Sequence, residues 1–141
     1  MKENPVESWI GLWETNRGCP FKCDFCDWGT GAKKRMADYR MDRIFQEIDW
    51  FSKNEIFWVY CCDANFGLYP KRDLPIAQKM AQNKLQYGFP VSLSVQNTKN
   101  STDVIYDIQK TLNDSGLSRG VLLAFQSLDS EVLEAIHRDN I

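Results

Sequence analysis

Three cysteines fall within one short segment near the start of the chain, GCPFKCDFC (residues 18–26). Their spacing, C-x3-C-x2-C, places Cys19, Cys23 and Cys26 on a loop that can turn three sulfurs toward a common centre. The thiolate form of cysteine is a soft ligand that selects zinc, copper(I) or iron–sulfur clusters. Lys22 can help to hold these thiolates in their charged form. The loop therefore predicts a metal centre.

The number of cysteines argues against a structural zinc site. Such sites normally use four protein ligands, usually as two spaced pairs, and this loop offers three. Cys61, Cys62 or His137 could in principle supply the fourth ligand, but nothing in the spacing requires it. A four-iron cluster, in contrast, can be held through three of its irons, which leaves the fourth iron open to another ligand. Three cysteines therefore favour a reactive cluster.

Four apolar runs predict the strands that must position this loop. Residues 56–62 form a continuous run of apolar, aromatic and β-branched side chains, which is typical of a strand buried on both faces. Residues 121–125 have the same character. Residues 9–13 predict a first strand, and residues 91–95, in which apolar side chains alternate with serines, predict another.

Helical segments separate these runs. Apolar residues recur at i, i+3, i+4 and i+7 in three stretches, each of which predicts a helix with one face on a sheet. Gly88 is placed to end the second helix. Asp129 is expected to open a fourth helix, with Glu131 in its first turn. The three stretches are residues 41–51, 74–85, and 105–112 behind a cap at Ser101 or Thr102.

The order of these elements, βαβαβαβα, indicates a parallel sheet with right-handed crossovers. A closed TIM barrel needs eight βα units and about 250 residues, whereas this chain of 141 residues carries about four units. The predicted fold is therefore an α/β partial (β/α) barrel, open rather than closed, as one domain over residues 1–141. We expect its open sheet edge to be covered by a partner chain or by self-association.

Polar side chains follow three of the predicted strands. Asp63 and Asn65 come after the second strand, Gln96 after the third, and Gln126 after the fourth. Ligands of parallel α/β folds bind at the carboxyl ends of the strands, where the loops converge. Taken singly, each residue could be an ordinary turn or cap residue. Their joint placement beside a thiolate loop favours a binding site.

The composition excludes several other functions. A formal net charge of -2 and a pI near 5.4 argue against a nucleic-acid partner. No apolar run approaches the roughly 18 residues of a membrane span, and the first residues lack a signal-peptide core. We therefore expect a cytoplasmic protein without a membrane partner. Its five cysteines are then expected to stay reduced.

The cysteine loop, with the aromatic Phe25 before its last cysteine, resembles the signature of the radical S-adenosylmethionine (SAM) superfamily. The stretches ETNRGCPFKCDFCDWG, DANFG and FQSLDSEVLEAIHRDNI resemble one group of that superfamily, which often carries an N-terminal cobalamin-binding domain. The likeness runs from Trp13 to Ile141 and corresponds to the N-terminal portion of the core. The cysteine loop is highly specific, and the other stretches are moderately so.

This resemblance implies a [4Fe–4S] cluster on Cys19, Cys23 and Cys26, with the open iron bound by the amino and carboxylate groups of SAM. One electron delivered through the cluster would cleave SAM to methionine and a 5′-deoxyadenosyl radical. The resemblance also implies an electron donor such as a flavodoxin or ferredoxin, and cobalamin in a domain outside this chain. It does not name the substrate.

The SAM contacts are carried over residue by residue. Phe25 would lie against the adenine, and Gln96 would contact the ribose. Asp63 and Asn65 belong to the segment that would meet the SAM amino group, although it reads Asp-Ala-Asn where the family more often has Gly-Gly-Glu.

Two further contacts come from the last stretch. Gln126 resembles a SAM-contacting glutamine, and Arg138 resembles an arginine that pairs with the SAM carboxylate. Such a pairing suits the guanidinium fork.

Two other functions stay open. An iron–sulfur electron-transfer module would use a fourth thiolate from Cys61 or Cys62 and would not respond to SAM. A zinc-binding scaffold would hold zinc without sulfide.

Overall fold

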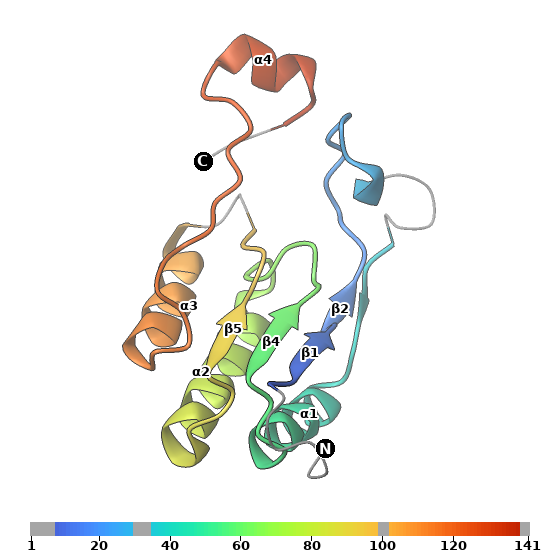
Figure 1. Ribbon diagram of the computed structural model, residues 1–141. Coiled ribbons are helices and arrows are strands. Elements are labelled where there is room, and N and C mark those ends of the chain that lie inside the picture. Colours follow the sequence, from blue (N-terminus) through green and yellow to red (C-terminus); the bar gives the residue numbers. More distant parts are fainter. Residues whose placement is uncertain (1–7, 30–34, 99–101, 139–141) are drawn as a thin grey trace.

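The computed structural model describes residues 8–29, 35–98 and 102–138, and Figure 1 shows their arrangement. Strands and helices alternate through most of this range, as the sequence predicts. The elements are β1 (Ile10–Trp13), β2 (Asn16–Arg17), the short 3-10 helix η1 (Asp27–Gly29), β3 (Ala37–Asp38), α1 (Met41–Lys53), β4 (Trp58–Cys61), α2 (Pro70–Tyr87), β5 (Ser92–Ser94), α3 (Thr102–Asp114) and α4 (Ser130–Ala135).

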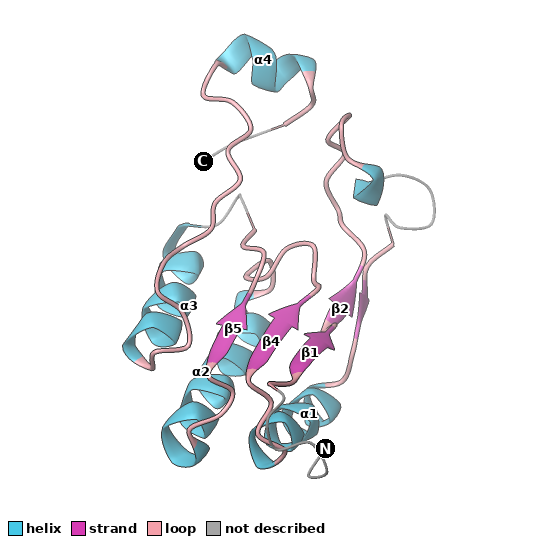
Figure 2. Ribbon diagram, in the orientation of Figure 1, coloured by secondary structure: helices cyan, strands magenta, loops and turns pink. Residues whose placement is uncertain are grey.

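Three parallel strands form the main sheet, in the order β1-β4-β5 (Figure 2). α1 connects β1 to β4, and α2 connects β4 to β5, so each crossover is helical. A parallel bridge between Phe66 and Asn97 extends the pairing past the carboxyl ends of β4 and β5. The prediction of an α/β fold with an open parallel sheet is confirmed.

A small antiparallel pair, β2–β3, continues from the end of β1 and carries the cysteine loop between its two strands. Asn16 pairs with Asp38, and Arg17 pairs with Ala37. The loop is therefore held at the carboxyl edge of the main sheet, where the sequence places it.

The helices bury the apolar stripes that predict them. In α1 the buried side chains include Ile44, Ile48 and Phe51. α2 lies between α1 and α3 and contacts both. It ends at Gly88, whose left-handed φ of 78° provides the predicted cap. The helices and strands share one core, which includes Val59 on β4.

The predicted strand at residues 121–125 is wrong, because the structure gives this segment no strand pairing. Its backbone contacts the end of β5 through Leu122, whose carbonyl accepts a hydrogen bond from Asn97 Nδ2 at 3.0 Å. An apolar run becomes a strand where a neighbour pairs along it and helices cover it. Here α4 lies apart from the sheet, as Figure 1 shows, and does not cover this segment. Leu122 and Leu123 are therefore exposed in the described chain.

α4 begins where the sequence predicts. The Asp129 carboxylate accepts hydrogen bonds from the backbone N–H groups of Glu131 and Val132, which makes it the N-cap. None of the side chains of α4 is buried, however, including its apolar ones. Ser101, one of the two candidate caps of α3, lies outside the described residues.

Among the residues that the structure describes, no helix combines the length and the apolar character that crossing a membrane would require.

Candidate functional site

A cavity of about 520 Å³ lies at the carboxyl edge of the sheet. This volume falls in the usual range of small-molecule sites. Its walls come from the cysteine loop, the segments after β4 and β5, and the C-terminal part of the chain. All nine residues singled out from the sequence line it: Cys19, Cys23, Phe25, Cys26, Asp63, Asn65, Gln96, Gln126 and Arg138.

The cysteine loop turns tightly at one wall of the cavity. Cys19 and Cys23 are each 7% exposed, and Cys26 is partly exposed. The backbone N–H of Cys26 donates to the carbonyl of Cys23 at 3.0 Å, which closes the turn between the second and third cysteine. Gly18 enters the loop with a φ of 104°, a conformation that glycine adopts without steric cost.

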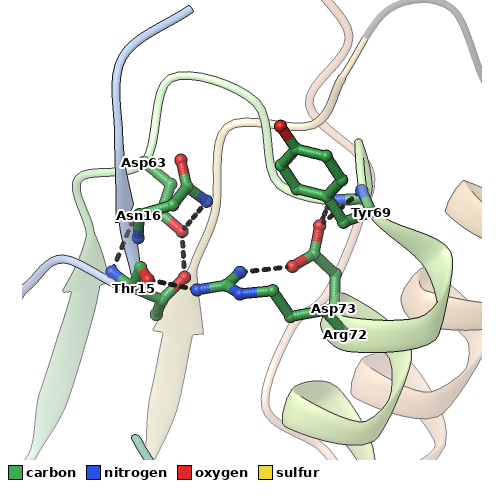
Figure 3. A network of polar contacts seen from close by, with 7 residues as sticks. Thr15, Asn16, Asp63, Tyr69, Arg72 and Asp73 are labelled. Carbon is green, nitrogen blue, oxygen red and sulfur yellow. Dashed lines mark hydrogen bonds and ion pairs between the residues drawn. The ribbon is translucent and has the colours of Figure 1, made fainter. Parts of the chain in front are cut away.

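The Asp63 carboxylate fastens the end of β4 to the turn after β1. Its Oδ1 accepts hydrogen bonds from the backbone N–H groups of Thr15 and Asn16, at 2.7 and 3.2 Å. Its Oδ2 accepts from the Thr15 hydroxyl and, at 2.9 Å, from Asn16 Nδ2. All three residues are buried, and Figure 3 shows them converging on the carboxylate.

An ion pair on α2 continues this network (Figure 3). Arg72 donates to Asp73 Oδ1 at 2.7 Å and also to the carbonyl of Thr15. Asp73 Oδ2 accepts from the backbone N–H groups of Gly67 and Tyr69, at 2.8 and 3.1 Å. We call Thr15, Asn16, Asp63, Arg72 and Asp73 the brace. It ties the β1 turn, the end of β4 and the start of α2 into one unit.

Burial dominates the electrostatics of this ion pair. Desolvation raises the pKa of the Asp73 carboxyl, although the hydrogen bonds from Tyr69 and Gly67 and the charge of Arg72 act in the opposite direction. Of the five brace residues, only Asp63 lines the cavity, so the brace is mainly a structural network behind the wall. The sequence expected Asp63 to meet a ligand, but its carboxylate is occupied by Thr15 and Asn16.

Asn65 contacts the cysteine loop directly. Its side-chain Nδ2 donates to the sulfur of Cys19 at 3.1 Å, and both residues are buried. A cysteine sulfur that ligates a metal is a hydrogen-bond acceptor, so an amide N–H directed at Cys19 is compatible with a ligand role for this residue.

Gln96 is held by an aromatic neighbour. Its Nε2 donates to the Tyr60 hydroxyl at 3.0 Å, and its backbone carbonyl accepts from the Phe66 N–H at 2.7 Å. Tyr60 also lines the cavity. Sequence analysis did not select Tyr60, because a tyrosine within an apolar run looks like a core residue. The available signal was the alternation of a strand, which places Tyr60 on the opposite face from the buried Val59 and Cys61.

Residues 118–138, which we call the arm, form the opposite wall. Gln126 lines the cavity and has a φ of 63°, a left-handed conformation that is uncommon for this residue type. Arg138 is 7% exposed, donates to the Ala124 carbonyl, and lies with its guanidinium carbon 6.0 Å from the centre of the Phe25 ring. The arm thus brings its two predicted residues to the cavity without forming a fourth strand.

The end of the arm meets the cysteine loop at Asp24. The Asp24 backbone N–H donates to the Ile136 carbonyl at 3.2 Å, and the Asp24 carboxylate lies 2.7 Å from His137 Nδ1. His137 is therefore engaged on the outside of the loop.

The two remaining cysteines differ from one another. Cys61 is fully buried in the core, and burial raises the pKa of its thiol well above the ordinary value, which disfavours the thiolate. Cys62 lines the cavity. In the part of the chain that the structure describes, no three histidine, cysteine or acidic side chains converge as they would around one metal ion. Ligands on three corners of a cubane lie further apart than ligands on one ion.

The residues present fit an iron–sulfur cluster on chemical grounds. The three cysteines of the loop line one cavity, two of them are shielded from solvent, and an amide N–H points at the sulfur of Cys19. Sulfur ligation, burial and hydrogen bonds to sulfur are the features that protein cluster sites share.

Two curated relatives are each 45% identical to this chain over 130 residues. They are the cobalamin-dependent radical SAM methyltransferase TokK of Streptomyces tokunonensis and the 2-(S-pantetheinyl)-carbapenam-3-carboxylate methyltransferase of Streptantibioticus cattleyicolor. Each match covers 92% of this chain and 19% of the relative, so the chain spans about a fifth of these proteins. No protein-family model matches the chain.

Solved structures give the same fold. TsrM of Kitasatospora setae, a radical SAM methyltransferase solved with tryptophan substrate and the SAM analogue aza-SAM, superposes with a TM-score of 0.72 at 18% identity, over 89% of this chain and 23% of that one. A second TsrM structure, with cobalamin and a [4Fe–4S] cluster bound, gives a TM-score of 0.71 over 88% of this chain and 22% of that one, also at 18% identity.

Proposed function

Because this chain belongs to the radical SAM superfamily, as a relative of one portion of its cobalamin-dependent methyltransferases, we propose that it forms the cluster-binding and SAM-binding part of such an enzyme. One observation carries the proposal. Nine residues selected from the sequence, spread from the cysteine loop to the end of the arm, line a single cavity of ligand size. A structural role for each residue alone would not require them to meet.

In this proposal Cys19, Cys23 and Cys26 hold a [4Fe–4S] cluster, which when bound supplies an open iron and the single electron that cleaves SAM. Cys19 and Cys23 keep their ligating sulfurs away from water. Because the Asp63 carboxylate already accepts hydrogen bonds from Thr15 and Asn16, this residue would contact SAM through its backbone rather than its side chain.

The remaining contacts hold SAM in place. Phe25 offers a half-exposed ring beside the cysteines, which suits the adenine. Gln96, fixed by Tyr60, is placed for the ribose. Arg138 supplies a permanent positive charge for the SAM carboxylate, and Gln126 an amide near it. Cobalamin would lie outside this chain, and an electron donor such as a flavodoxin or ferredoxin would reduce the cluster.

The proposed reaction class is methyl transfer, because the relatives are named as methyltransferases. The acceptor of the methyl group is left open by the residues described, since they account for the cofactor side of the cavity.

Anaerobic reconstitution of the chain with iron and sulfide tests the proposal. We expect the reduced protein to give the electron paramagnetic resonance signal of a [4Fe–4S] cluster, and we expect SAM to change that signal, because SAM would bind the open iron. The Cys23→Ser variant should lose its iron, because only two cysteines of the loop would remain to hold the cubane. Cys61→Ala is the matched control, because Cys61 lies in the core and outside the cavity.

Cys62→Ala separates the proposal from an electron-transfer module. Three-cysteine ligation predicts that this variant keeps its iron and its response to SAM. Loss of the cluster from Cys62→Ala, together with a parent signal that SAM does not alter, would favour four-thiolate electron transfer. Zinc without sulfide in the purified parent protein would favour a zinc-binding scaffold.

A further inference from the structure

Asn65 makes a contact that neither the sequence nor a role in SAM binding explains. Its side-chain Nδ2 donates to Cys19 Sγ at 3.1 Å, across 46 positions of the sequence. Each of the two residues is 7% exposed, so water competes little for either partner. The amide nitrogen, rather than the amide oxygen, must face the sulfur, because a thiolate accepts hydrogen bonds and cannot donate them.

The backbone on both sides of Asn65 is fixed, so the amide is aimed before any ligand binds. Two residues earlier, the Asp63 carboxylate accepts hydrogen bonds from Thr15 and Asn16. In the next position, Phe66 is fully buried, and its N–H donates to the Gln96 carbonyl at 2.7 Å. Phe66 also forms the parallel bridge to Asn97. A side chain supported in this way acts as a preorganised donor.

We infer that Asn65 is a positioning residue that raises the reduction potential of the cluster by donating a hydrogen bond to Cys19. The inference rests on the proposed function, since it concerns the cluster that the three cysteines would hold. Reduction adds one electron to the cluster and increases the negative charge that its cysteine sulfurs carry. A buried N–H donor stabilises that charge, so it favours the reduced form.

The test is a potentiometric titration of the anaerobically reconstituted chain, followed by electron paramagnetic resonance and carried out without SAM. A chemical reductant supplies the electron. Asn65→Leu keeps the approximate shape of the side chain and removes the donor. Asn65→Asp keeps the shape and places a negative charge beside the sulfur. Asn113→Asp adds the same charge at an exposed position on α3 and is the control.

We expect all three variants to keep the parent's iron and sulfide content. The reduction potential should shift to more negative values in Asn65→Leu and further in Asn65→Asp, while Asn113→Asp matches the parent. Parent-like potentials in both Asn65 variants would overturn the inference and leave the proposed function intact. Loss of iron from both variants would also overturn it, because the contact would then hold the ligand rather than tune the cluster. A parent protein without a cluster would instead overturn the proposed function.

Discussion

The brace supports one wall of the cavity through Asp63, and the arm forms another wall; the two are held in different ways. The brace residues are buried and bonded to one another across three segments of the chain. The arm exposes large apolar side chains, among them Leu122, Leu123 and Phe125. Polar bonds join it to the rest of the chain at Asp24 and Asn97. Folding of the sheet therefore fixes one wall, and local polar contacts place the other.

This difference assigns different roles to the two walls. A wall built into the core can hold a cluster ligand in a fixed position, because any movement would break several buried hydrogen bonds. A wall whose large apolar side chains stay exposed buries less surface and can adjust at lower cost in free energy, which suits a surface that meets a ligand such as SAM. We therefore expect changes in the brace to alter stability and changes in the arm to alter binding.

The largest expected effect contrasts two leucines of similar sequence context. Leu93 on β5 is 3% exposed, whereas Leu122 in the arm is 60% exposed. Leu93→Ala should lower the free energy of unfolding by about 2–5 kcal/mol, because it leaves a cavity in the core. Leu122→Ala should change it by less than about 0.5 kcal/mol. Urea denaturation of both variants measures the difference.

An equal loss of stability in the two variants would break the comparison. It would mean that the arm packs in solution as a strand does, with Leu122 buried rather than exposed. If both variants instead lost little stability, Leu93 and the strand β5 would contribute little to the core.

The same contrast shows how far the sequence predicts this molecule. Residues 56–62 and 121–125 look alike as apolar runs, yet only the first forms a strand, β4. Apolar character reflects what a segment can bury, whereas a strand also requires neighbours that the sequence does not identify. Helices α1 and α2 were predictable because their stripes and the Gly88 cap are local features.

The candidate site divides in a similar way. The cysteine loop is a local spacing, and the carboxyl ends of parallel strands meet by topology, so both were predictable. The bond between Asn65 and Cys19 joins residues 46 positions apart, and no local pattern reveals it. For Asp63 the sequence could not decide between a ligand contact and a structural one, because both use the same carboxylate; the structure shows bonds to Thr15 and Asn16.

A second prediction tests whether the brace is structural. Asp63→Asn keeps the shape of the side chain but turns one oxygen into an N–H donor that faces the donors of Thr15 and Asn16. Buried donors without acceptors cost free energy, so unfolding should become easier by about 3 kcal/mol. Urea denaturation measures the effect, and Asp107→Ala, exposed on α3, is the control. A stability close to the parent's would contradict the assignment of Asp63 to the brace.

A third prediction concerns the arm. Arg138→Ala removes the guanidinium that lies beside Phe25 in the cavity. In the reconstituted protein, SAM affinity should fall by about 1–3 kcal/mol, as expected for the loss of a charged hydrogen bond. Isothermal titration calorimetry measures this, with Arg119→Ala as the control, because Arg119 lies exposed on the arm and outside the cavity. SAM affinity equal to the parent's would remove Arg138 from the site.

The smallest effect is a dependence of the brace on pH. Desolvation raises the pKa of Asp73 above its ordinary value of 3.8 in the folded protein. The folded state therefore binds this proton more tightly than the unfolded chain does. The stabilising contribution of Asp73 is fully present below pH 3.8 and is lost as the pH rises through the folded pKa.

Asp73→Asn removes this titration, so the variant isolates the effect. We expect the stability difference, parent minus Asp73→Asn, to fall as the pH rises from about 4, and urea denaturation at several pH values measures it. Asn113→Ala, an exposed change that titrates nothing, should track the parent at each pH. A difference that instead grows with pH would mean that Arg72 outweighs desolvation and lowers the pKa of Asp73. Charge pairing rather than burial would then hold the brace together. The brace and the arm would then both depend on polar contacts.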